Sequence, residues 1–146
     1  MKEYKFDPVR ATEECVEWIK NWFEKNGPGC RAVVGISGGK DSSIVAALCV
    51  KALGKDRVFG VLMPRGEQFD ISCSHQLVDH LGIAHVVVNI KETADAMDKA
   101  VGEALGKDLT PQSLQNIPPR IRMTTLMLLI NHRRRMPLLR PARPSR

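Results

Sequence analysis

The sequence lacks a long apolar run, a secretion signal and a regular cysteine pattern. No stretch of its 146 residues approaches the ~18 apolar residues that cross a bilayer, and the N-terminus MKEYKFDPVR has no apolar core. The four cysteines are spaced 15, 19 and 24 residues apart, which matches neither a zinc site nor a CxxC redox pair. We therefore expect a cytoplasmic chain that contacts no membrane and keeps its thiols free in a reducing compartment.

The chain also lacks a positive charge excess outside its last residues. The formal net charge is +6, but residues 131–146 hold six arginines and no acidic residue. The remaining 130 residues carry 16 basic and 16 acidic side chains and are neutral. A nucleic-acid-binding domain concentrates basic residues on a folded face, so we expect no nucleic-acid partner.

Apolar residues make up 43% of the chain, which is enough for a packed core. The patterns predict helices over 9–25, 44–53, 70–81, 91–105 and 117–130, and strands over 31–36, 57–63 and 85–90. Strands that alternate with helices predict a Rossmann-like α/β fold, a three-layer α/β/α arrangement around a parallel sheet. Residues 110–116 are expected to form a polar loop, and Pro119 disfavours an α conformation at Pro118.

A glycine-rich turn between the first strand and the next helix, GISGGKDSS over residues 35–43, is the candidate site. It is neither a Walker A loop nor GxGxxG. Its glycines let the backbone approach a ligand, the helix N-terminus attracts anions, and its hydroxyls and Lys40 could add donors. Asp41 would repel a phosphate unless a divalent cation lay between them, so it indicates Mg²⁺. The structural alternative is a glycine turn capped by Asp41.

The stretch Ser-Gly-Gly-x-Asp-Ser after a strand resembles the pyrophosphate loop of the N-type ATP pyrophosphatases, whose fold is adenine nucleotide alpha hydrolase-like. Three further stretches are LMPRGEQFD (62–70), LGI (81–83) and NIPPRIRM (116–123). Together they resemble the ammonia-dependent NAD synthetases over about residues 1–130. The last stretch discriminates, although Pro119 stands where the family has alanine.

The resemblance implies that the nicotinate carboxylate of deamido-NAD is adenylated by ATP with release of pyrophosphate, and that ammonia then attacks the acyl-adenylate to give NAD and AMP. No side chain acts as a nucleophile, and Mg²⁺ on Asp41 offsets the charge of the leaving pyrophosphate. Arg120 would contact deamido-NAD and Arg122 would hold the local structure; without the resemblance both could be surface charges. The intact family member is a homodimer. The expected ATP-binding residues are Gly35, Ile36, Ser37, Gly38, Gly39, Lys40, Asp41, Ser42, Met63 and Gln68.

The resemblance ends near residue 130, at about half the expected family length. We expect residues 1–130 to be the N-terminal part of the synthetase domain and 131–146 to be a disordered basic tail, of the kind that a frameshift or truncation produces. In the family a later strand lies beside the first one, so residues 33–36 would form an open edge. We therefore expect a poorly stable, aggregation-prone chain with negligible activity alone. The alternatives are another N-type ATP pyrophosphatase, such as a tRNA-modifying enzyme, or a non-catalytic nucleotide-binding remnant.

Overall fold

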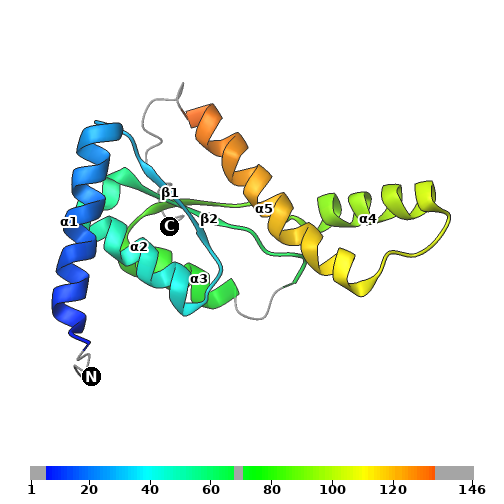
Figure 1. Cartoon of the computed structure of the whole chain (residues 1–146), viewed down its shortest axis with the longest axis horizontal. Coiled ribbons are helices and arrows are strands. Elements are labelled where there is room, and N and C mark those ends of the chain that lie inside the picture. Colours follow the sequence, from blue (N-terminus) through cyan, green and yellow to red (C-terminus); the bar gives the residue numbers. More distant parts are fainter. Residues whose placement is uncertain (1–5, 68–70, 134–146) are drawn as a thin grey trace, which may run out of the picture.

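The computed structural model describes residues 6–67 and 71–133 and shows a parallel sheet between helices (Figure 1). The sheet has three strands in the order β1-β2-β3, and each neighbouring pair is parallel. The predicted alternation is thus confirmed. In chain order the elements are α1 (Pro8–Asn26), β1 (Ala32–Ile36), α2 (Lys40–Leu53), the 3₁₀ turn η1 (Lys55–Arg57), β2 (Val58–Leu62), α3 (Ile71–Leu81), β3 (Ala84–Val87), α4 (Lys91–Leu105) and α5 (Pro111–Arg133).

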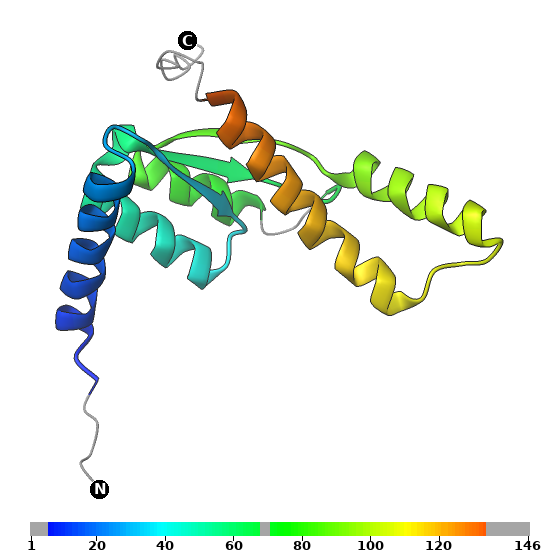
Figure 2. The ribbon, with the colours of Figure 1, turned by 45° about the horizontal axis from the view of Figure 1, so that its top comes forward.

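Helices cover both faces of the sheet, as predicted. On one face, residues of α1, α2 and α3 pack against alternate side chains of β1 and β2, including Val34, Ile36 and Leu62. On the other face, Ile121 and Leu126 of α5 pack against the remaining strand residues. Figure 2 shows α4 and the first half of α5 extending away from the sheet, whereas the second half of α5 lies over it. The central strand β2 is buried along its whole length, which explains its continuous apolar sequence.

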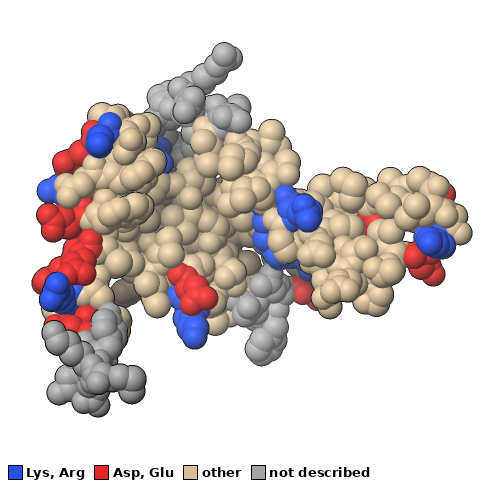
Figure 3. All heavy atoms as spheres, in the orientation of Figure 1, with Lys and Arg blue, Asp and Glu red and all other residues tan. Residues whose placement is uncertain are grey.

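β1 is an outer strand of the described sheet, and this confirms the predicted open edge. It pairs with β2 on one side only, and α5 crosses the neighbouring face. The C-terminal half of α5 exposes Met127 and Leu128, and few charged side chains lie over this part of the molecule (Figure 3). An unpaired strand edge beside exposed apolar side chains favours association between chains.

Helix α2 begins at Lys40, four residues before the predicted start. Gly39 has extended backbone angles at the N-cap, and the helix follows without any intervening turn. Asp41 lies in the first turn, where a carboxylate is favourable beside the positive end of the helix dipole. Residues 40–43 are polar, so the spacing of apolar residues did not predict this first turn.

Helix α5 contradicts two predictions, the loop over 110–116 and the conformation at Pro118. The helix begins at Pro111 because the hydroxyl of Thr110 accepts the Ser113 amide at 3.3 Å, and Pro111 suits a first helical position. It then continues through Pro118 and Pro119. Pro118 is buried, so packing outweighs the lost helical hydrogen bonds.

The predicted tail begins within α5, which runs to Arg133; residues 134–146 lie outside the described residues.

All four cysteines are free, as expected, and Cys15, Cys30 and Cys73 are exposed. No helix within residues 6–67 and 71–133 has the length and apolar character that a bilayer crossing needs.

Candidate functional site

The carboxyl end of β1 leads directly into residues 37–43, here called the glycine loop. Gly38 adopts φ +80°, a left-handed conformation that other residues adopt only with strain. Gly39 then caps α2 without any side-chain hydrogen bond to the first helical amides. The first amides of a helix have no carbonyl partner one turn earlier, so this end of α2 offers N–H donors to a ligand.

Serine hydroxyls hold the glycine loop in shape. The hydroxyl of Ser42 accepts the Ser37 amide at 3.3 Å, lies 3.1 Å from the Ser37 hydroxyl and donates to the Gly39 carbonyl at 3.1 Å. The hydroxyl of Ser43 donates to the same carbonyl at 2.9 Å. We expected the three serines to donate to a ligand. Instead Ser42 and Ser43 donate to the loop itself, because the Gly39 carbonyl lies within reach of both.

Asp41 is exposed on the first turn of α2 and forms no hydrogen bond or ion pair with the residues that the structure describes. No group of three or more His, Cys, Asp or Glu side chains gathers anywhere in those same residues. A Mg²⁺ site does not require such a group of side chains, because the ion keeps several water ligands and is bound by one or two carboxylates together with substrate phosphates. An unpaired carboxylate beside an anion-binding helix end therefore fits Mg²⁺ that arrives with a phosphate ligand.

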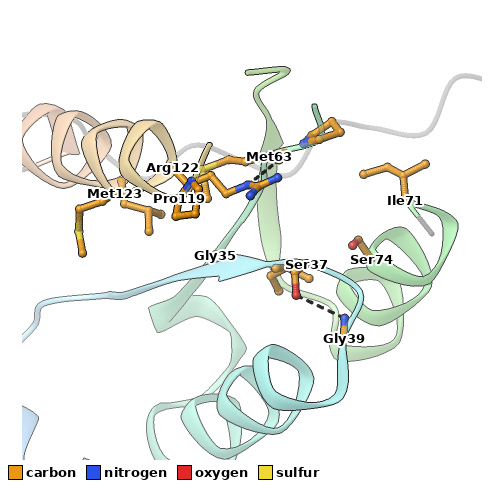
Figure 4. Close-up of a pocket in the computed structure, with 12 residues that line it drawn as sticks. Gly35, Ser37, Gly39, Met63, Ile71, Ser74, Pro119, Arg122 and Met123 are labelled. Carbon is orange, nitrogen blue, oxygen red and sulfur yellow. Dashed lines mark hydrogen bonds between the residues drawn. The ribbon is translucent and has the colours of Figure 1, made fainter. Parts of the chain in front are cut away.

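The second wall of the site is the strand-end loop, residues 63–66, which follows β2. Met63 and Pro64 are buried at the carboxyl edge of the sheet, next to the end of β1. Arg122 of α5 donates from Nε to the Met63 carbonyl at 3.1 Å (Figure 4). This bond agrees with the expectation that Arg122 holds the local structure. Gln68, which we expected beside Met63, lies outside the described residues.

The two walls enclose a pocket of about 640 Å³, in the size range of small-molecule sites. Figure 4 shows side chains of α3 and α5 closing it from opposite sides. The contribution of α3 to the pocket lining was not predicted. Its Ser74 is almost fully buried, on the same side of the helix as the apolar residues that face the core. The lining residues are Gly35, Ile36, Ser37, Gly39, Met63, Pro64, Ile71, Ser74, Pro119, Arg122, Met123 and Leu126.

Several predicted residues do not line this pocket. Lys40 and Arg120 are exposed, and neither they nor Gly38, Asp41 and Ser42 are among the lining residues. The glycine loop, which forms one edge of the pocket, nevertheless contains Gly38, Asp41 and Ser42. Arg120 follows the lining residue Pro119 on α5, but its side chain is exposed and is not part of the lining.

Two histidines lie outside the pocket, and His85 is exposed. They meet each other, since the rings of His75 and His85 lie 5.8 Å apart edge to face. His85 is on the outer strand β3, and His75 is on α3, which packs beside it. Because no third ligand joins them within the described residues, the pair forms no metal centre.

A parallel sheet whose first strand ends in a glycine turn and helix N-terminus defines a class, the α/β proteins that bind an anionic ligand at the carboxyl edge of the sheet. The model of the NAD synthase family matches residues 11–138. The chain belongs to this family. The match does not favour the tRNA-modifying alternative.

Similar proteins support the assignment. The NH₃-dependent NAD⁺ synthetase of Pyrococcus furiosus is 37% identical over 131 residues, covering 90% of this chain and 47% of that protein. The solved NH₃-dependent NAD synthetase from Campylobacter jejuni is 30% identical with a TM-score of 0.74, over 86% of this chain and 52% of that one. A glutamine-dependent NAD⁺ synthetase from Acinetobacter baumannii, 23% identical, shares the fold with a TM-score of 0.79 over 90% and 26% of the two chains. The chain thus spans about half the length of its ammonia-dependent relatives.

Proposed function

We propose that this chain carries the ATP-binding part of an ammonia-dependent NAD synthetase and works in NAD biosynthesis. The observation that carries the proposal is the shared pocket, in which the glycine loop, the strand-end loop and the Pro119–Arg122 segment meet. The discriminating motif and the phosphate-type loop are 80 residues apart in the sequence and line one cavity. Such convergence fits an enzyme that joins a nucleotide to a second substrate.

In this proposal the free amides at the start of α2 bind the phosphates of ATP, and the serine-braced loop keeps them in place. Met63 and Gln68 contact the adenosine, and Arg120 contacts deamido-NAD. The pocket holds the nicotinate carboxylate in line with the α-phosphate, so that adenylation releases pyrophosphate and ammonia then displaces AMP. Positioning and charge neutralisation perform the catalysis, and no side chain acts as a nucleophile.

Asp41 would hold Mg²⁺ together with phosphate oxygens. The ion would supply positive charge where negative charge builds up on the departing pyrophosphate. We further propose a homodimer for the intact family member. A reducing, cytoplasmic setting is supported by exposed thiols without a disulfide.

The binding part of the proposal is tested by calorimetric titration of this chain with ATP, with and without Mg²⁺. We expect Mg²⁺ to strengthen ATP binding, and Asp41→Asn to weaken the Mg²⁺-dependent binding by about tenfold, which corresponds to about 1.4 kcal/mol. Asp56→Asn is the matched control, because Asp56 is an exposed acid in η1 without an ion pair among the described residues. Absence of ATP binding, or an equal loss in both variants, contradicts the proposed site.

The catalytic part is tested by mixing the chain with deamido-NAD, ATP and ammonia and measuring NAD and pyrophosphate. We expect negligible turnover by this chain alone, because β1 is an outer strand of the described sheet and the chain spans about half the length of its ammonia-dependent relatives. ATP binding without pyrophosphate release is the result that a nucleotide-binding remnant gives. NAD formation at the rate of a synthetase would contradict the expected inactivity and confirm the activity class.

A further inference from the structure

Asn89 connects the strand-end loop to the start of α4. Its Oδ1 accepts the amide of Gly66 at 3.0 Å and the amide of Lys91 at 3.0 Å. Its Nδ2 lies 3.5 Å from the Gly66 carbonyl, as a donor. One side-chain amide therefore binds both polar groups of Gly66 and also the first turn of α4. Gly66 has a φ of +75°, a left-handed conformation that glycine adopts without strain and that turns the chain away from the strand.

The neighbouring contacts fix the same loop to the same helix. The amide of Ile90 donates to the Pro64 carbonyl at 2.8 Å, so the backbone pairing of β2 and β3 extends beyond the strands. The guanidinium of Arg65 lies 3.5 Å from a carboxylate oxygen of Asp95 and 3.4 Å from one of Asp98. The other carboxylate oxygen of Asp98 is buried and has no hydrogen-bond partner among the described residues, an arrangement that costs free energy.

These contacts matter for the pocket because Met63 and Pro64 line it. Arg122 binds the Met63 carbonyl from the α5 side, and Asn89 binds the loop from the α4 side, three residues further along the chain. The loop that forms this wall is therefore held at both ends. Asn89 itself is exposed and is not a lining residue, so any effect on a ligand must pass through the loop.

We propose that Asn89 is a positioning residue for ATP: it sets the strand-end loop where Met63 and Pro64 meet the nucleoside part of the nucleotide. The inference rests on the proposed function, which gives the glycine loop to the phosphates and the strand-end loop to the adenosine. It predicts that Asn89 acts on the nucleoside half of the ligand alone. A ligand that consists only of phosphates does not reach the strand-end loop.

The test compares ATP with inorganic pyrophosphate, each titrated with Mg²⁺ by calorimetry. In Asn89→Ser the short hydroxyl still accepts the Lys91 amide and supports the start of α4, but it does not reach Gly66. We expect this variant to weaken ATP binding by about fivefold, the value of one or two modest hydrogen bonds, and to change pyrophosphate binding by less than about twofold. Asn89→Asp keeps both acceptor bonds and should restore most of the ATP affinity.

The matched control is Asn26→Ser. Asn26 is also exposed and also bonds a backbone carbonyl, that of Trp22, but it lies at the end of α1. Unchanged ATP binding in Asn89→Ser, or an equal loss for ATP and pyrophosphate, overturns the inference, as does a loss that Asn89→Asp fails to rescue. Absence of ATP binding by the unaltered chain overturns the proposed function first and this inference with it. Circular dichroism shows whether each variant is folded, and if Asn89→Ser is not folded at the assay temperature, the comparison of ATP with pyrophosphate is made at a lower temperature at which it is.

Discussion

The two walls of the pocket are built in opposite ways. The glycine loop is held by hydrogen bonds between residues two to five positions apart, and the Ser42 hydroxyl takes part in three of them. The strand-end loop is held by Asn89, 23 residues away, by Asp98, 33 residues from Arg65, and by Arg122, 59 residues from Met63. One wall is local and the other depends on tertiary packing.

The two loops should respond differently when parts of the chain open locally. A loop braced by its own neighbours keeps its shape whenever β1 and α2 form. A loop braced by distant helices keeps its shape only when α5 packs against β1 and α4 packs against α5. Since local opening of α4 or α5 removes the braces of the strand-end wall and leaves those of the glycine loop intact, we expect the strand-end wall to loosen first when these helices open. Phosphate binding should therefore be more robust than recognition of the nucleoside.

The largest expected effect comes from Gly35, where the two walls touch. A Cβ at this position would lie 3.2 Å from Met63 Cε and 3.6 Å from Leu126 Cδ1. The larger side chain of Gly35→Val should displace both neighbours, destabilise the chain by about 1–3 kcal/mol and weaken ATP binding more than about tenfold. Urea denaturation and calorimetry measure the two effects.

Gly35→Ala is the graded control. Its single methyl group meets the flexible end of Met63, which can move by a few tenths of an ångström, so we expect a cost below about 1 kcal/mol. An ATP affinity in Gly35→Val equal to that of the unaltered chain would show that the walls tolerate separation, and the idea of a shared junction would be wrong.

The local wall was predictable from the sequence, and so were the strands that carry it. A β-branched run, two glycines and a cluster of serines stand next to each other in the chain, so their proximity in space needs no knowledge of the fold. Only the start of α2 was misplaced, because its first turn is polar. The class of fold followed from the alternation of strands and helices, which is also a local pattern.

The distant wall was only partly predictable. The resemblance pointed to Met63 and to Arg122, but no pattern in the sequence pairs Asn89 with Gly66 or Arg65 with Asp98. These contacts depend on the register of β3 beside β2 and on the direction in which α4 leaves the sheet. The start of α5, by contrast, could have been predicted from the sequence. Thr110, Pro111 and Ser113 form a typical helix start, but the spacing of apolar residues alone does not indicate it.

Two substitutions of intermediate effect separate the walls. Arg122→Met keeps the length of the side chain and removes the donor to the Met63 carbonyl, at an expected cost of about 1–2 kcal/mol in stability. It should weaken ATP binding and leave pyrophosphate binding nearly unchanged. Ser42→Ala removes three of the hydrogen bonds that brace the glycine loop and should weaken the binding of ATP and of pyrophosphate to the same extent. If calorimetry shows the same ratio of ATP to pyrophosphate affinity in both variants, the walls are not independent.

The smallest expected effect is the pH dependence of the distant wall. Hydrogen bonding and charge attraction from Lys91, with a further contribution from Arg65, lower the pKa of Asp95 below its ordinary value of 3.8. A carboxylate whose pKa is lower in the folded chain stabilises the fold above the unfolded pKa and loses that contribution as the pH falls through the folded value. Between neutral pH and pH 3, Asp95→Asn should therefore make the urea midpoint slightly less pH-dependent. Because these side chains are exposed, 1 M salt should remove most of the difference, and a difference that persists in salt would place Asp95 in a tighter contact than an exposed ion pair.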